Sequence, residues 1–369
     1  AIKFALQEQS EFKTGKSILG YMWQGLDNLT DRRWALVTIA GAGVITIVCS
    51  IVMQDLRIGD LDSGAPELRP ESRYNQDNAY FTSHYGLSSD QFVIIVKTNE
   101  EGCRLYGALV KMDALAQALR QDSAVQTTIS LAETTRYITS AMFEGSAKWN
   151  ALNRDQAILN AAVSAGIISS PDITNPQCSV SPLVTYLTDH KADTLTRVLA
   201  ISEQFAAENN TLDSDHPIEF LLAAGSAGIE AATNIEVEKS ILTMYLAVYG
   251  ATALLCLITF KSIRATVIAL IPLIMTTIIC KALMVWLGIG LKVSTLPVIA
   301  VGVGVGVDYA LYLLSVQIAV QRRGQSLREA YRQSLNFTGK VVALVGVTMA
   351  AGVVTWVCLL YTSDAADDL

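Results

Sequence analysis

Long apolar runs interrupt the alternation of polar and apolar residues at five places along this chain, and each run holds roughly 20 residues with almost no charge. A helix of that length crosses a hydrocarbon core of about 30 Å. The pattern therefore predicts a polytopic α-helical membrane protein with five spans, at residues 34–53, 241–260, 265–287, 294–318 and 341–360.

Between the first two spans the pattern changes to short alternating and helical segments, which predict an α/β domain over residues 54–240. Two successive βαβ units favour a ferredoxin-like split fold with a helical insertion over residues 133–166, and another α+β arrangement remains the alternative. The expected strands cover residues 91–98, 125–131, 183–187 and 218–223, and the expected helices cover 104–120 and 193–207.

Basic residues mark one side of the membrane. Lys and Arg are concentrated in residues 1–33, 261–264 and 319–340, which are therefore expected to be cytoplasmic. Residues 54–240 then lie outside the cytoplasm. That segment carries 13 Lys and Arg against 25 Asp and Glu, as a translocated domain can.

The amino-acid composition excludes some classes of protein function. The chain has 369 residues, of which 51% are hydrophobic and 17% charged, with a net charge of −7. These values exclude a soluble enzyme, and the acidic balance excludes a nucleic-acid partner. Cys103 and Cys178 are the two cysteines of the outer domain and form a disulfide candidate, with two free thiols as the alternative.

Asp308 is the one acidic residue within the five expected spans, about 12 Å from the cytoplasmic edge at 1.5 Å per residue. An ionised carboxylate there costs about 2.5 kcal/mol or more, so this group is expected to take up and release a proton. The alternative is a protonated Asp that bonds a neighbouring helix. Tyr309 could relay the proton through its hydroxyl, or could simply pack.

Small and hydroxyl-bearing residues accompany Asp308. Gly302, Gly304 and Gly306 precede it and would let a neighbouring helix approach closely. In the fifth span Gly352 lies on one face with two threonines. Thr348 and Thr355 could line a polar path to Asp308, or could bond their own helix carbonyls.

Enzyme chemistry finds little support. The histidines at 84, 190 and 216 show no metal-ligand spacing, and no nucleophile elbow is present. Residues 14–17 lack the upstream glycine of a Walker A motif, and the glycine repeat lies in an apolar span rather than a βαβ unit. We therefore expect no metal, no cofactor and no enzymatic activity. Lys281, the other intramembrane charge, is expected to snorkel outward.

The stretch Gly304 to Leu313, with residues 64–75, 223–234 and 287–297, resembles one half of a resistance-nodulation-division (RND) permease, specifically the MMPL-like predicted exporters. The resemblance implies export of hydrophobic or lipid-like compounds, driven by the proton gradient, across a bacterial inner membrane. It implies that Asp308 and Tyr309 form the proton-relay pair, and that residues 54–240 are a periplasmic porter domain.

The chain departs from this family in having five spans where a half has six, and in starting with Ala1. We expect a truncated carboxy-terminal half: residues 1–33 are the linker, 241–360 the bundle and 361–369 a non-native tail. Its expected partners are the amino-terminal half, lipids or hydrophobic small molecules, and further copies of the chain in a homo-oligomer. A SecD/SecF-like protein-export factor and a sterol-sensing, Patched-like lipid receptor remain alternatives.

Overall fold

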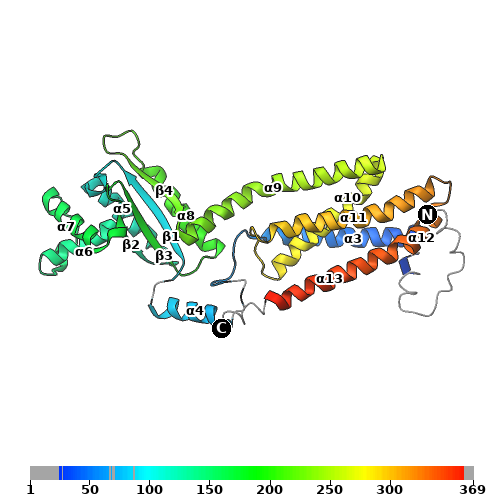
Figure 1. Cartoon of the computed structure of the whole chain (residues 1–369), viewed down its shortest axis with the longest axis horizontal. Helices are drawn as coiled ribbons and strands as arrows, with labels where there is room; N and C mark the ends of the chain where they lie inside the picture. The colour runs from blue at the N-terminus through cyan, green and yellow to red at the C-terminus, as the bar shows by residue number, and fades with distance from the viewer. Residues whose placement is uncertain (1–24, 27, 66–67, 69–70, 86–87, 361–369) are drawn as a thin grey trace. The chain divides into compact units, whose positions relative to one another are not determined.

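The computed structural model describes residues 25–26, 28–65, 68, 71–85 and 88–360. The chain divides into two compact units (Figure 1). One comprises residues up to 56 with 242–287 and 295–358, and the other comprises 57–241, 288–294 and 359–360 among its described residues. Residues 1–24 of the expected cytoplasmic linker and residues 361–369, the expected tail, lie outside the described part of the chain.

Five helices of the described chain are long and apolar enough to cross a membrane. All five expected spans coincide with one of them. They are α3 (Arg32–Val52), α9 (Gly225–Phe260), α10 (Ile263–Trp286), α11 (Leu296–Gln321) and α13 (Lys340–Leu360).

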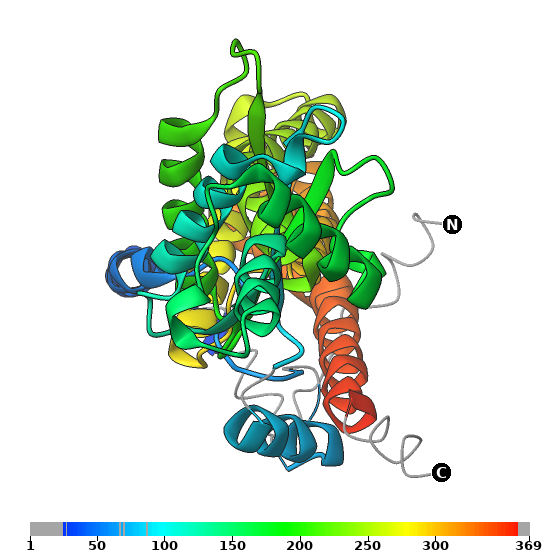
Figure 2. The same ribbon diagram turned by 90° about the vertical axis from the view of Figure 1, so that its left-hand side faces the viewer.

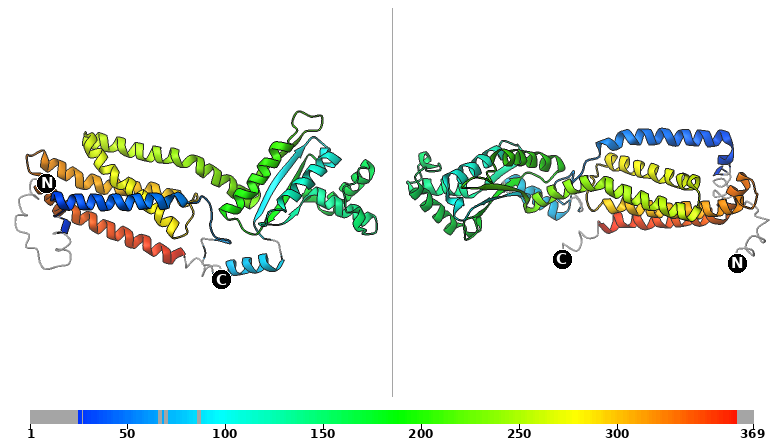
Figure 3. Two further views of the ribbon diagram at one scale, coloured as in Figure 1. Left: turned by 180° about the vertical axis from the view of Figure 1, so that it is seen from behind. Right: turned by 90° about the horizontal axis from the view of Figure 1, so that it is seen from above.

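In the spanning unit α10 packs against both α3 and α11, and the three run side by side (Figure 3). Its buried centre is small: Cys256 and Phe260 of α9 meet Ala265 and Ala269 of α10, and apolar residues of α11 pack around them. Most other large side chains of the spans are exposed, such as Ile39 at 68%. Outward-facing apolar surface is what helices surrounded by lipid require.

The second unit, called the outer unit below because residues 54–240 are expected to lie outside the cytoplasm, contains a four-stranded antiparallel sheet in the order β2-β3-β1-β4. Its strands are β1 (Gln91–Thr98), β2 (Val125–Ile129), β3 (Val180–Leu187) and β4 (Ile218–Ala224). Along β1 and β3 every second residue is buried, because alternate side chains of a strand point to opposite faces. The sheet therefore has one apolar face that helices cover.

Two helices supply that cover, α5 (Tyr106–Leu119) between β1 and β2 and α8 (Ala192–Asn209) between β3 and β4. They contact each other and the sheet (Figure 2). Residues spaced three or four apart on α5, including Leu109, Met112 and Leu119, are fully or almost fully buried in the core that results. Strand and helix positions agree with the sequence expectation to within about three residues.

The segment between β2 and β3 is helical, as expected. It forms α6 (Leu131–Met142) and α7 (Gln156–Ser169), which pack against each other. Side chains cap both starts: Ser130 accepts a hydrogen bond from the Glu133 amide, and Asp155 accepts from the amides of Ala157 and Ile158.

Several features were not anticipated. Helix α9 begins at Gly225, 16 residues before the expected start of the second span, so a single helix leaves the outer unit and continues into the spanning unit. An additional helix, α4 (Arg73–Tyr85), precedes the sheet, and a short helix, α12 (Leu327–Ser334), precedes α13.

The loop 288–294 groups with the outer unit although it joins two spans. Its Leu291 forms a parallel bridge with Ile58, and the Leu291 amide donates to the Arg57 carbonyl at 2.9 Å. The segment that follows the first span and the loop between the third and fourth spans are thus joined through their backbones.

Candidate functional site

Asp308 lies within α11, and its side chain is exposed on the surface of the spanning unit. Among the described residues no hydrogen bond or ion pair to its carboxylate is seen. Charge exposed to hydrocarbon is costly, so this position in a bilayer needs a polar or protein surface beside it.

Tyr309 is half-buried and lines a small cavity of about 170 Å³. The wall opposite comes from Phe337 and Thr338 and from the first turns of α13, where valines predominate. Tyr312, one turn further along α11, shares the cavity. The cavity joins the neighbourhood of the Asp-Tyr pair to the beginning of the fifth span, and its aromatic lining was not anticipated from the sequence.

The threonines of α13 bond their own helix. The Thr348 hydroxyl donates to the carbonyls of Leu344 and Val345 at 3.0 and 2.9 Å, and the Thr355 hydroxyl donates to the Gly352 carbonyl at 2.6 Å. This is the usual bonding of Thr in a membrane helix. Neither residue lines the cavity beside Tyr309.

The glycines of α11 differ in what they touch. A Cβ added to Gly306 would lie 2.5 Å from Cδ2 of Leu273, so this glycine permits close contact with α10. A Cβ on Gly302, Gly304 or Gly352 would meet no heavy atom of the described residues within 4 Å.

Lys281 of α10 places its ammonium 4.3 Å from the ring centre of Tyr245 on α9, a cation–π arrangement. The side chain is half-buried between helices rather than extended to the surface. The sequence offered no signal for this pair, because the two residues are 36 positions apart on different spans.

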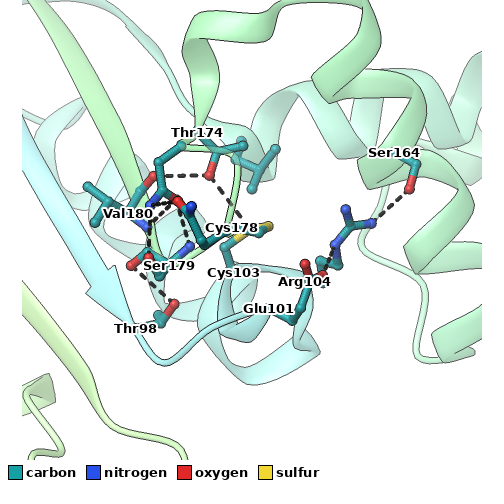
Figure 4. The surroundings of a disulfide bond; sticks show 12 residues. Thr98, Glu101, Cys103, Arg104, Ser164, Thr174, Cys178, Ser179 and Val180 are labelled. Atoms are coloured by element: carbon teal, nitrogen blue, oxygen red, sulfur yellow. Dashed lines mark hydrogen bonds and ion pairs between the residues drawn. A yellow bond between two sulfur atoms is a disulfide. The ribbon is translucent and has the colours of Figure 1, made fainter.

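Cys103 and Cys178 form a disulfide in the outer unit, with their Cα atoms 5.3 Å apart (Figure 4). Cys103 lies in a short 3₁₀ turn after β1, and Cys178 in the turn before β3, where its φ of 47° is left-handed. The Asn175 side chain holds this turn by accepting from the amides of Ser179 and Val180. Both cysteines are buried.

An open cavity of about 510 Å³ lies at the end of the sheet near this disulfide. Its lining is mainly apolar and comes from the turn after β1, the start of α5 and the loop before β4. Leu105, Tyr106, Ala108 and Ile218 are among its residues, and Lys111 and His216 add polar groups. No motif marked it in the sequence, because its walls are about 100 residues apart.

The three histidines of the outer unit differ in their exposure to solvent. His84 and His216 are exposed, whereas His190 is mostly buried and its Nδ1 lies 3.1 Å from Oδ1 of Asp90. This hydrogen bond raises the pKa of His190 above its usual value, and partial burial opposes the shift.

A comparison with protein-family models matches residues 78–363 to the MMPL family, well over half of the chain. A comparison with curated proteins finds no match. The matched region covers the sheet of the outer unit, the spans α9, α10, α11 and α13, and the Asp308–Tyr309 pair. The chain therefore belongs to the MMPL family, which suggests an RND-type membrane transporter of hydrophobic compounds.

Proposed function

We propose that this chain is one half of a proton-driven exporter of hydrophobic or lipid-like compounds across a bacterial inner membrane, and that Asp308 carries the proton. The observation that carries the proposal is a single carboxyl group placed in α11, the one acidic residue within the hydrophobic stretches of the five spans. Membrane interiors tolerate such a group mainly where it has a function.

Coupling requires Asp308 to be neutral in one state of the transporter and charged in another. Protonation removes the cost of holding a charge in a low-dielectric environment, so it favours the state in which helices enclose the group. Deprotonation favours the state in which water reaches it. A gradient that loads the proton from one side can therefore bias the packing of α11 against its neighbours.

Tyr309 is the proposed relay partner, because it is adjacent in sequence and half-buried beside the cavity shared with the start of α13. Thr348 and Thr355 would extend the path only if their hydroxyls rotate away from the carbonyls they now bond. Gly306 would let α10 remain close to α11 as the packing changes.

The exposure of Asp308 supports a partner surface. A carboxylate facing lipid would be strongly disfavoured, so we infer that companion spans cover it in the working transporter. The amino-terminal half of the same permease is the first candidate, and a second copy of the chain is the other.

We further infer that the outer unit is a ferredoxin-like porter domain on the periplasmic side. Its strand order β2-β3-β1-β4 and its two βαβ units agree with that fold. The apolar cavity of about 510 Å³ has the size and lining that a hydrophobic compound needs, and we assign it to the substrate path.

The test is transport by the complete permease containing this chain, reconstituted in proteoliposomes with an imposed pH gradient and a fluorescent phospholipid as the probe. Asp308→Asn keeps the shape of the protonated group and removes its exchangeable proton, so gradient-driven flux should fall to the level of empty vesicles. Tyr309→Phe should reduce the flux several-fold, because only a hydroxyl is lost.

Asp213→Asn, an exposed acidic position in the outer unit, is the matched control and should transport at the parental rate. Gel filtration in detergent checks that each variant is folded. A folded Asp308→Asn permease that transports like the parent would show that Asp308 has a structural role, and would refute proton coupling through it.

A further inference from the structure

Three side chains from distant parts of the sequence meet in the outer unit. Asp60 follows the first span, His190 precedes α8, and Glu230 lies in the second turn of α9. One potential ligand atom from each lies within 4.8 Å of the other two. These three residues are called the Asp60 cluster below, and none of them belongs to the transport site proposed above.

The backbone around the cluster holds it together. The Ala192 amide donates to the Asp60 carbonyl at 2.8 Å, which connects the segment after the first span to the start of α8. Gly59 has a φ of 107°, and a Cβ there would lie 2.5 Å from the Asn234 side chain on α9. Only glycine fits this conformation and this close contact, so Asp60 is placed against α8 and α9 at once.

His190 is oriented by a carboxylate. Its Nδ1 lies 3.1 Å from Oδ1 of Asp90, and the two side chains are 12% and 15% exposed. With the Nδ1 proton donated to Asp90, the lone pair of the neutral ring lies on Nε2. Metal-binding histidines commonly have this second carboxylate partner, which sets the ring orientation and increases the basicity of the free nitrogen.

Glu230 provides an independent sign that a ligand is expected. Its Oε1 atom is buried and has no hydrogen-bond partner among the described residues. A buried carboxylate oxygen left without a partner is costly, and native proteins rarely contain one unless another group satisfies it. A cation bound between Glu230 and its neighbours would supply the missing interaction.

Charge around the cluster also favours a cation. Lys292 pairs with Oδ1 of Asp60 at 2.6 Å. Lys292 contributes one positive charge, whereas Asp60, Asp90 and Glu230 contribute three carboxylates. The group is therefore negatively charged when His190 is neutral. Asp60 has a second oxygen, Oδ2, that can bind a metal while the first keeps its lysine.

We propose that Asp60, His190 and Glu230 bind a divalent transition-metal ion of the zinc class, with Asp90 as the positioning partner of His190. One imidazole nitrogen and two carboxylate oxygens form a mixed donor set that suits Zn²⁺, and water can complete the coordination. The ion would join the segment after the first span to the starts of α8 and α9 within the outer unit.

The experiment uses the full chain in detergent, purified without a polyhistidine tag, stripped with a chelator and then dialysed against Zn²⁺ at pH 7.5. Mass spectrometry of the metal content should find one Zn²⁺ per parental chain. His190→Gln and Glu230→Gln should each bind at least tenfold more weakly in competition with a chromophoric chelator. Asp90→Asn should weaken binding about 10- to 100-fold, because the imidazole loses its orienting partner.

His216→Gln removes an exposed histidine of the same unit and is the matched control, which should bind like the parent. Thermal unfolding supplies a second readout, because Zn²⁺ should raise the Tm of the parent and of His216→Gln but not of His190→Gln. Variants with parental gel-filtration profiles count as folded. If the stripped parent takes up no Zn²⁺, or if His190→Gln binds it with parental affinity, the proposal is wrong and the cluster is only a network of ion pairs.

Discussion

Asp122 lies in the turn between α5 and β2, and its side chain is 13% exposed. Its Oδ1 accepts from the Ala124 amide at 2.8 Å, and its Oδ2 lies 3.1 Å from Nε of Arg197 on α8. These two hydrogen bonds lower the pKa of Asp122 below its usual value. The bond from the Ala124 amide has the larger effect, and the bond from Arg197 the next. One carboxylate therefore holds a turn and joins it to the helix layer.

Because the folded pKa of Asp122 is depressed, its contribution to stability is present above the unfolded pKa of 3.8 and is lost as pH falls through the folded pKa. Asp122→Asn should lower the free energy of unfolding by about 1 kcal/mol at pH 7, a modest value because Arg197 is half-exposed. Thermal unfolding of the full chain in detergent should show a Tm lower by about 2–4 °C.

The difference in Tm between Asp122→Asn and the parent should shrink as the pH is lowered toward 3. Asp213→Asn, at an exposed position, should unfold like the parent throughout. An Asp122→Asn chain whose deficit stays the same at pH 7 and pH 3 would contradict a role for the ionised carboxylate.

Among the elements, β1 and β3 are joined twice, by their backbone ladder and by the disulfide that links the turn after β1 to the turn before β3. The cysteines are separated by 75 residues, a segment that includes α5, β2 and the helical pair α6 and α7. Closing so long a loop in the unfolded chain reduces its conformational entropy substantially.

Replacing Cys103 and Cys178 together by serine should destabilise the outer unit by about 2–4 kcal/mol. The measurement is thermal unfolding of the full chain in detergent, with Cys49→Ser of α3 as the control expected to unfold like the parent. Mass mapping without reductant should recover one peptide pair linked through Cys103 and Cys178. Recovery of both as alkylated thiols after rapid quenching would contradict the disulfide in the native protein.

For the whole molecule, the orientation predicted from the basic links places residues 319–340 in the cytoplasm and the outer unit on the opposite side. The structure offers two exposed positions for a test, Gln325 before α12 and Ser214 in the loop before β4. The neighbouring Ser326 is left unchanged, because its hydroxyl and backbone amide form a capping box with Glu329 at the start of α12.

A cysteine at Ser214 should react with an impermeant maleimide added to intact spheroplasts, and a cysteine at Gln325 should react only after the membrane is opened. The chain without an added cysteine gives the background from cysteines in the spans. Labelling of Gln325→Cys in intact spheroplasts, with Ser214→Cys protected, would reverse the orientation and place the outer unit in the cytoplasm.

Local pattern was sufficient for the spans and for most elements of the outer unit. A bilayer imposes the same apolar requirement on every residue of a span, so a run such as residues 34–53 is visible without knowledge of its neighbours. Strand β1 was equally clear, because residues 92–96 form a short run of apolar, mostly β-branched side chains. Asp308 was conspicuous by its charge within such a run.

Contacts between distant segments were decided only in the folded chain. The start of α9 at Gly225 was hidden because residues 225–240 mix charged and polar side chains with a few apolar ones, such as Ala227 and Ala231, that pack in the core of the outer unit. Asp60, His190 and Glu230 have no characteristic spacing, since 130 and 40 residues separate them. Periodicity in the sequence shows which face of a helix or strand is buried. The segment that covers this face depends on loops and packing far along the chain, so the Asp60 cluster became visible only in the folded structure.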